Sequence, residues 1–129
     1  MSVRKVLLVL SLVGVTLAAT ACRPNIVGTD AGVYSAGTLY AVLNQDLDTA
    51  YQATVKAMED LELRIRDKAK DVFSAKVLAE GADGKKATVI LKPRPDGDID
   101  LRIAVGLANQ QRSVVIYDQI KKNLGMPAK

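Results

Sequence analysis

The stretch Ile99-Asp100-Leu101-Arg102-Ile103-Ala104-Val105 has the clearest strand pattern in the chain, and it decides the fold. Its four branched or long apolar side chains point to one face, while Asp100 and Arg102 point to the other. A strand with one apolar and one polar face is typical of an antiparallel sheet that is buried on a single side. The stretch therefore predicts a half-buried antiparallel sheet.

The same period of two recurs on the N-terminal side of this strand. It predicts further strands over residues 38–43, 61–66, 72–80 and 86–92. In the strand at 72–80, the side chains assigned to one face are Phe73, Ala75, Val77 and Ala79. The polar segment 67–71 is predicted to be a turn. Asp83-Gly84 is typical of a hairpin, because its second residue accepts a positive φ.

Two amphipathic helices are expected around these strands. Apolar side chains recur at steps of three and four over residues 47–61, and Asp46 is placed to cap this helix. A second helix follows Asn109 as its cap, and Gly125 ends it. Its apolar side is formed by Ser113, Ile116, Ile120 and Leu124.

The resulting order of elements is β-α-β-β-β-β-α, with the globular domain over residues 37–125 and a short tail over 126–129. We expect an α+β fold, in which a five-stranded antiparallel sheet carries both helices on one face. This arrangement resembles the helix-grip domains, in which a sheet curls around a helix and sometimes leaves a cavity.

Residues 1–21 have the layout of a signal peptide, because two basic residues precede an uninterrupted run of apolar and small residues. The run from Val6 to Ala21 is shorter than the roughly 20 residues of a membrane-spanning helix. The following segment, 22–36, shows no sustained period, and we expect it to be a flexible tether.

The junction between leader and tether carries the main site prediction. Ala19, Thr20 and Ala21 are small enough for a signal peptidase to reach, and Cys22 supplies a thiol that can carry a lipid. The junction resembles the bacterial lipobox, with Ala19 standing where leucine is usual. We expect Cys22 to be lipidated, and the alternative is an uncleaved membrane anchor.

Composition excludes several kinds of chemistry within this chain. It has no histidine, and Cys22 is its only cysteine. An intrachain disulfide, a Cys/His zinc site and a Ser/His or Cys/His dyad are therefore excluded. Of the 18 basic residues, Arg4 and Lys5 lie in the leader, which leaves 16 against 14 acidic ones. This balance does not favour nucleic-acid binding.

The remaining candidates for chemistry are carboxylates and a run of basic residues. Glu59, Asp60 and Glu62 are interpreted as a solvated helix end, and Asp96, Asp98 and Asp100 as turn residues without EF-hand spacing. Arg64, Arg66, Lys68 and Lys70 are interpreted as a solvated strand edge, although such a run can also contact anionic headgroups or an acidic partner. We predict no catalytic residue, no metal site and no cofactor.

Four segments carry a resemblance to a known family. They are Leu47-Asp48-Thr49-Ala50-Tyr51, Met58-Glu59-Asp60-Leu61-Glu62-Leu63, Ala82-Asp83-Gly84 and Ile103-Ala104-Val105-Gly106. With the leader, they resemble a family of small uncharacterised bacterial lipoproteins with this same order of elements. A glycine often stands in that family where this chain has Glu62. The resemblance implies no activity.

These observations predict a membrane-anchored lipoprotein that faces the periplasm, with the outer membrane favoured over the inner because Arg23 rather than aspartate follows Cys22. We expect a non-enzymatic domain that binds another envelope protein of unknown identity. The alternative is a periplasmic carrier that holds a small apolar ligand between helix and sheet. The small side chains Ala41, Ala50, Ala75 and Ala79 favour that alternative, since they would leave room for a ligand.

Overall fold

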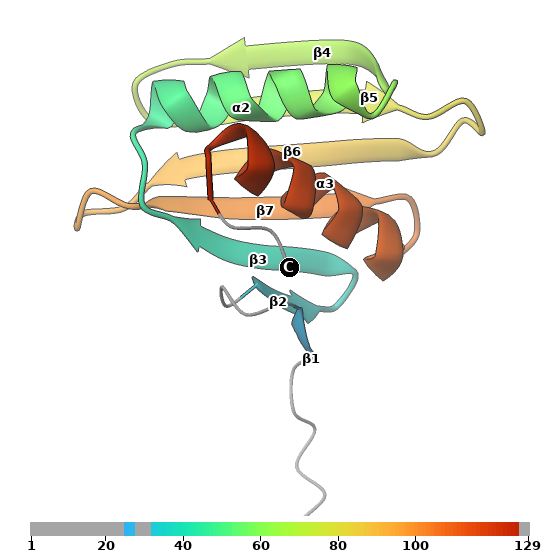
Figure 1. Ribbon diagram of the computed structural model, residues 1–129, viewed down its shortest axis with the longest axis horizontal. Helices are drawn as coiled ribbons and strands as arrows, with labels where there is room; N and C mark the ends of the chain where they lie inside the picture. Colours follow the sequence, from blue (N-terminus) through green and yellow to red (C-terminus); the bar gives the residue numbers. More distant parts are fainter. Residues whose placement is uncertain (1–24, 28–31, 127–129) are drawn as a thin grey trace, which may run out of the picture.

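The computed structural model describes residues 25–27 and 32–126, and Figure 1 shows its ribbon. The elements in chain order are β1 (Asn25–Val27), β2 (Gly32–Ser35), β3 (Thr38–Leu43), α2 (Leu47–Asp60), β4 (Arg64–Lys70), β5 (Ala75–Glu80), β6 (Lys86–Pro93), β7 (Ile99–Val105) and α3 (Gln110–Asn123). The α+β class, the antiparallel sheet and the two helices are confirmed. Neither of these helices is long and apolar enough to cross a membrane.

The sheet has more strands than the five predicted. Its order is β1-β2-β3-β7-β6-β5-β4, in which six strands of four to eight residues are joined by the three-residue β1 at one edge. Both added strands lie in the segment 22–36 that was expected to be a tether. They are too short for a period of two to be recognised. The turn between β2 and β3 also uses Ala36 (φ 49°) where Gly or Asn is usual.

The strand and turn predicted over residues 61–74 are displaced along the chain from where the structure has them. β4 covers most of the segment predicted to be a turn at 67–71, and residues 61–63 precede it. The pairing of β4 with β5 shifts between Ile65 and Asp67, so a bulge breaks the alternation. The turn instead lies at residues 71–74, where the Asp71 carboxylate accepts hydrogen bonds from the backbone N–H groups of Phe73 (2.7 Å) and Ser74 (2.9 Å). Phe73, predicted to lie on a strand, is 81% exposed.

One face of the sheet forms the core together with both helices. α2 packs over β4, β5 and β6, while α3 packs over β7 and β3 (Figure 1). The four inward positions predicted for β7 are all buried, as are Ala75, Val77 and Ala79 of β5. Alternate residues of β3 and β6 are buried on the same face. At this face Ala50, Ala53 and Ala57 let α2 approach the sheet closely. The opposite face of the sheet is not covered by either helix.

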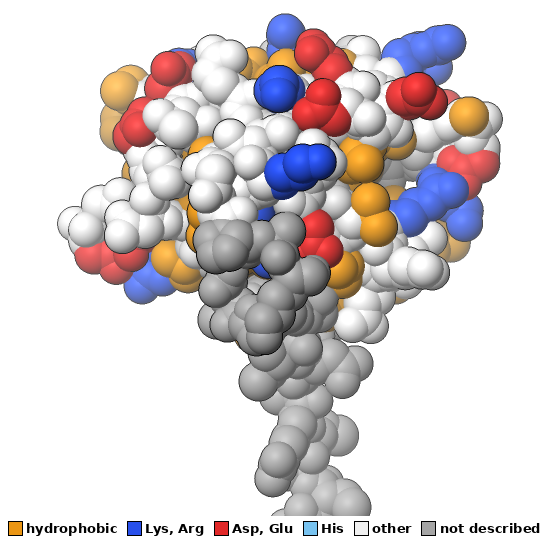
Figure 2. Space-filling view, viewed as in Figure 1, with side chains coloured by type: hydrophobic (Ala, Val, Ile, Leu, Met, Phe, Trp, Pro, Cys, Tyr) orange, Lys and Arg blue, Asp and Glu red, His pale blue; other side chains and the backbone are white. Residues whose placement is uncertain are grey.

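Local sequence signals fix the ends of both helices. The Asp46 carboxylate accepts from the N–H of Thr49 (3.1 Å), and the Asn109 side chain accepts from the N–H of Arg112 (3.0 Å), which confirms both predicted caps. The hydrogen bonds from Thr49 lower the pKa of Asp46. In the space-filling view of the helix side, acidic and basic side chains are interspersed (Figure 2).

Candidate functional site

The residues predicted to be functional from the sequence lie outside the described part of the structure. These are Cys22, the proposed lipidation site, and Ala19, Thr20 and Ala21, the proposed peptidase recognition residues. The described chain begins at Asn25 in β1, three residues after Cys22. The sheet therefore starts three positions after the proposed anchor point in the sequence.

Within the described residues, an apolar pocket, which we call the end pocket, lies at one end of the helix pair. It has a volume of about 330 Å³ and lies where α2 ends, β6 begins, β7 ends and α3 passes overhead. Its lining is Leu61, Glu62, Leu63, Gly81, Ala82, Lys85, Ala87, Val105, Arg112, Val115 and Ile116. Most of these groups are apolar, and the charged ones are few, as in sites for small organic ligands.

The exit of α2 forms one wall of the end pocket. The N–H of Leu63 donates to the carbonyl of Met58 (2.9 Å), and the N–H of Glu62 donates to the carbonyl of Glu59 (3.0 Å). These two bonds define a Schellman motif, whose C′ residue adopts a left-handed conformation. Glu62 has a φ of 58°, which most residues other than glycine avoid. Its exposed side chain stands where the wall of the pocket meets solvent.

An ion pair holds the rim of the end pocket. Arg112 of α3 contacts Asp83 of the β5–β6 hairpin through two atom pairs, Nη2 to Oδ2 at 2.5 Å and Nη1 to Oδ1 at 3.0 Å. The hydrogen bond from Arg112 is the main reason that the pKa of Asp83 falls to about 2. A Cβ added at Gly81 would lie 2.9 Å from Asp83 Oδ1, so a larger residue there would displace this carboxylate from its observed position.

A second, charged hollow adjoins the end pocket across Glu62, Gly81 and Ala82. It has a volume of about 280 Å³ and is also lined by Arg64, Arg66, Glu80 and Gly84. Arg66 Nε donates to Glu80 Oε2 at 2.8 Å, whereas Arg64 has no ion pair among the described residues. An apolar pocket beside a charged hollow suits a molecule that has an apolar part and a polar end.

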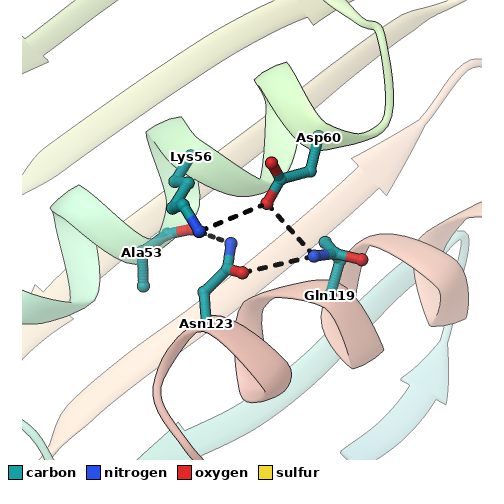
Figure 3. A network of polar contacts seen from close by, with 5 residues as sticks. All are labelled: Ala53, Lys56, Asp60, Gln119 and Asn123. Atoms are coloured by element: carbon teal, nitrogen blue, oxygen red, sulfur yellow. Dashed lines mark hydrogen bonds and ion pairs between the residues drawn. The ribbon is translucent and has the colours of Figure 1, made fainter.

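Asp60, one of the acidic residues considered in the sequence, has structural partners. Asp60 lies 4.0 Å from Lys56, as expected for residues four apart on a helix, and also accepts from Gln119 of α3 at 3.2 Å. Gln119 in turn donates to Asn123, whose amide donates to the carbonyl of Ala53 (Figure 3). This network ties α2 to α3. It gives Asp60 a role in positioning the helices.

The other acidic residues considered in the sequence, Asp96, Asp98 and Asp100, lie in or beside the turn between β6 and β7. The Asp96 carboxylate accepts from the N–H of Asp98 at 3.0 Å, and Arg94 lies near both Asp96 (3.3 Å) and Asp100 (3.6 Å). In the part of the chain that the structure describes, no three His, Cys, Asp or Glu side chains form a group that could hold a metal ion.

The end pocket was not predicted, because its lining comes from segments up to 55 positions apart, between Leu61 and Ile116. A partial signal existed at two positions. Glu62 stands at the predicted end of the first helix, and Asp83-Gly84 marks the hairpin that supplies the rim. Neither signal predicts a pocket by itself, because the pocket forms only where the fold places the two segments next to each other.

Comparison with known families gives one match. Residues 5–123 match the family described as "Protein of unknown function (DUF3568)". The match includes Cys22 and every described strand and helix, and it ends at the last residue of α3. It confirms the resemblance to an uncharacterised family. A search of curated proteins finds no match to this chain.

Proposed function

Since the chain belongs to this family of unknown function, its role follows from its own residues, and we propose that it is a lipid-anchored bacterial envelope lipoprotein. In this proposal the α+β domain is a non-enzymatic module in the periplasm that binds another envelope component, with the outer membrane as its site. The observation that carries the proposal is the apolar leader that ends in Ala19-Thr20-Ala21-Cys22. The family match includes this junction.

The chemistry of Cys22 supports permanent anchoring. Each methylene group of a buried acyl chain contributes about 0.8 kcal/mol, so one chain binds a membrane marginally while two or three hold a protein there. A lipidated N-terminal cysteine carries that number of chains. The lack of histidine and of another cysteine in the chain supports a binding role over a catalytic one.

Metabolic labelling with a radioactive fatty acid tests the anchor. We expect the full chain to incorporate label and the Cys22→Ser variant to lose it completely. Ala19→Leu serves as the matched control, because it restores the usual lipobox residue and should retain the label. Label that persists in Cys22→Ser would show that the acyl group lies elsewhere and would overturn the proposal.

The end pocket favours a second candidate function, a carrier of a small apolar ligand. The ligand would lie at the end of the helix–sheet interface, as in a helix-grip-like domain, and not along its length. Ala41, Ala50, Ala75 and Ala79 are all at least 95% buried, so they support close packing and leave the pocket at the end.

Native mass spectrometry after gentle detergent extraction tests the carrier function. We expect a bound lipid-like mass on the full chain and a several-fold loss of that mass in Val115→Trp, which fills the pocket. Leu107→Trp is the control, since Leu107 is fully exposed and does not line the end pocket. Absence of any bound mass under several growth conditions would exclude this function.

A further inference from the structure

The face of the sheet opposite the helices carries a net positive charge. Register places the outward side chains of β3 to β7, which we call the outer face, as Thr38, Tyr40, Val42, Arg64, Arg66, Asp67, Ala69, Lys76, Leu78, Glu80, Lys86, Thr88, Ile90, Lys92, Asp100, Arg102 and Ala104. Six of these are basic and three are acidic. The two helices carry four basic and four acidic residues. The outer face therefore carries a net charge of +3 and the two helices a net charge of zero, while Lys68 and Lys70 of β4 lie on the helix side by register.

The centre of the outer face combines apolar and cationic groups. Tyr40 and Val42 are 41% and 43% exposed. The guanidinium carbon of Arg102 lies 5.7 Å from the centre of the Tyr40 ring, and Ile90 is the cross-strand neighbour of Arg102 on the other side. Tyrosine and arginine with aliphatic neighbours suit the boundary between water and lipid, since each has an apolar body and a polar end.

The position of Cys22 restricts which partner can reach this face. Only Arg23 and Pro24 separate Cys22 from Asn25 of β1, so an extended chain spans at most about 10 Å between them. β1 is an edge of the sheet and is joined through β2 to β3, where the outer face begins. If Cys22 is lipidated as proposed above, the sheet is therefore held against the bilayer.

We propose that the outer face lies against anionic lipid headgroups of the membrane that anchors Cys22. Bacterial phospholipid surfaces that contain phosphatidylglycerol are negative, and clustered Lys and Arg bind such surfaces. The helices, which have balanced charge, then face away from the membrane. This orientation leaves the end pocket accessible between bilayer and solvent, and it rests on the lipid anchor in the proposed function.

Depth-dependent fluorescence quenching tests this orientation. The full lipidated chain is reconstituted in vesicles of phosphatidylethanolamine and phosphatidylglycerol that contain a headgroup-level nitroxide lipid. A fluorophore is attached to single introduced cysteines at Val42→Cys or Thr88→Cys on the outer face, and at Gln52→Cys or Gln111→Cys on the helices. We expect quenching to be several-fold stronger at the two outer-face positions.

Charge reversal separates electrostatic docking from the anchor. We expect the double variant Lys76→Glu/Lys92→Glu to lose most of the difference in quenching, as should wild type in phosphatidylcholine vesicles. The matched control is Lys56→Glu/Lys122→Glu, which reverses two exposed lysines on the helices and should keep the difference. Unchanged circular dichroism would show that both variants fold.

The possible failures are distinguishable. If the protein floats with the vesicles but quenching is equal at all four labelled positions, the proposed orientation is overturned and the lipid anchor is not. Outer-face positions that are shielded from lipid, in a species with the mass of a dimer, would assign this face to a second copy and also overturn it. If Cys22 takes up no fatty acid and the chain does not float, the anchor fails and the orientation fails with it.

Discussion

Glu62, like Ala36 and Ala108, has a positive φ although it is not a glycine. Its φ of 58° is required by the Schellman motif that ends α2, and glycine is the usual residue at that position. A left-handed conformation costs a residue with a Cβ roughly 1–2 kcal/mol. Because this residue also borders the end pocket and the charged hollow, its side chain is a candidate contact for a ligand.

We predict that Glu62→Gly stabilises the protein by about 1 kcal/mol, because it removes the strain of the left-handed conformation. Chemical unfolding measures this change. Glu62→Ala is the control, since it removes the carboxylate but retains the Cβ, and should give little or no gain. A loss of stability in Glu62→Gly would show that the glutamate side chain makes a stabilising contact.

The ion pair of Asp83 with Arg112 gives a prediction about pH. In the folded protein the pKa of Asp83 is about 2, below its usual value of 3.8, chiefly because Arg112 donates a hydrogen bond to the carboxylate. A depressed pKa adds stability that is present above the unfolded value and is lost as the pH falls through the folded value. The gain should therefore be present above about pH 4 and disappear towards pH 2.

Unfolding of Asp83→Asn and wild type across pH 2 to 6 measures this effect. We expect the difference in the free energy of unfolding to be constant near neutral pH and to shrink as the pH falls from 4 to 2. Asp67→Asn controls for loss of one outward carboxylate, because Asp67 has no ion pair among the described residues. An Asp83→Asn difference that does not vary over this range would contradict the prediction.

At the scale of elements, the turn between β4 and β5 differs most from expectation. Period alone predicted that Phe73 shares a strand face with Ala75, Val77 and Ala79, and the two alanines and the valine are indeed buried in β5. Asp71 instead holds residues 71–74 in a turn through two side-chain hydrogen bonds. The strand therefore starts at Ala75, and the only phenylalanine of the chain is left outside the core.

We predict that Phe73→Ser changes the free energy of unfolding by less than about 0.5 kcal/mol, because an exposed side chain contributes little to stability. Leu101→Ala is the comparison. Leu101 is buried in β7, and such truncations cost about 2–5 kcal/mol through lost burial and a residual cavity. Denaturant titrations of both variants measure the contrast. A large loss in Phe73→Ser would place its side chain in a packed environment.

At the scale of the whole molecule, β7 is the centre of the fold. It lies fourth of seven in the sheet, pairs with β3 on one side and β6 on the other, and contacts α3. The edges have a different character. β4 at one edge is rich in charged residues and bulged, features that discourage pairing with other chains, while β1 at the other edge lies beside the proposed anchor.

The rate of native-state amide hydrogen exchange should differ between the centre and the edges of the sheet. We predict the slowest amide exchange in β7 and its neighbours β3 and β6, because their opening requires disruption of the core. Exchange in the outer half of β4 should be faster by orders of magnitude. Mass spectrometry of peptides from each strand measures the pattern. Protection of β4 equal to that of β7 would indicate that another chain covers this edge.

Sequence alone determined the features that depend on local period and local hydrogen bonds. β3 and β7 begin and end where predicted, Asp46 and Asn109 cap their helices, and the hairpin forms at Asp83-Gly84. In each case the relevant partner lies within a few positions, so the residue types carry the signal. The prediction of Cys22 as the anchor also rests on a local pattern, and it lies outside the described residues.

Only the tertiary structure decided the features that depend on distant partners. β2 becomes a strand through its pairing with β3, and the bulge in β4 is defined only by its partner β5. The end pocket needs α2, α3 and the β5–β6 hairpin in contact. These features depend on burial and register between segments far apart in the chain, which no local pattern specifies.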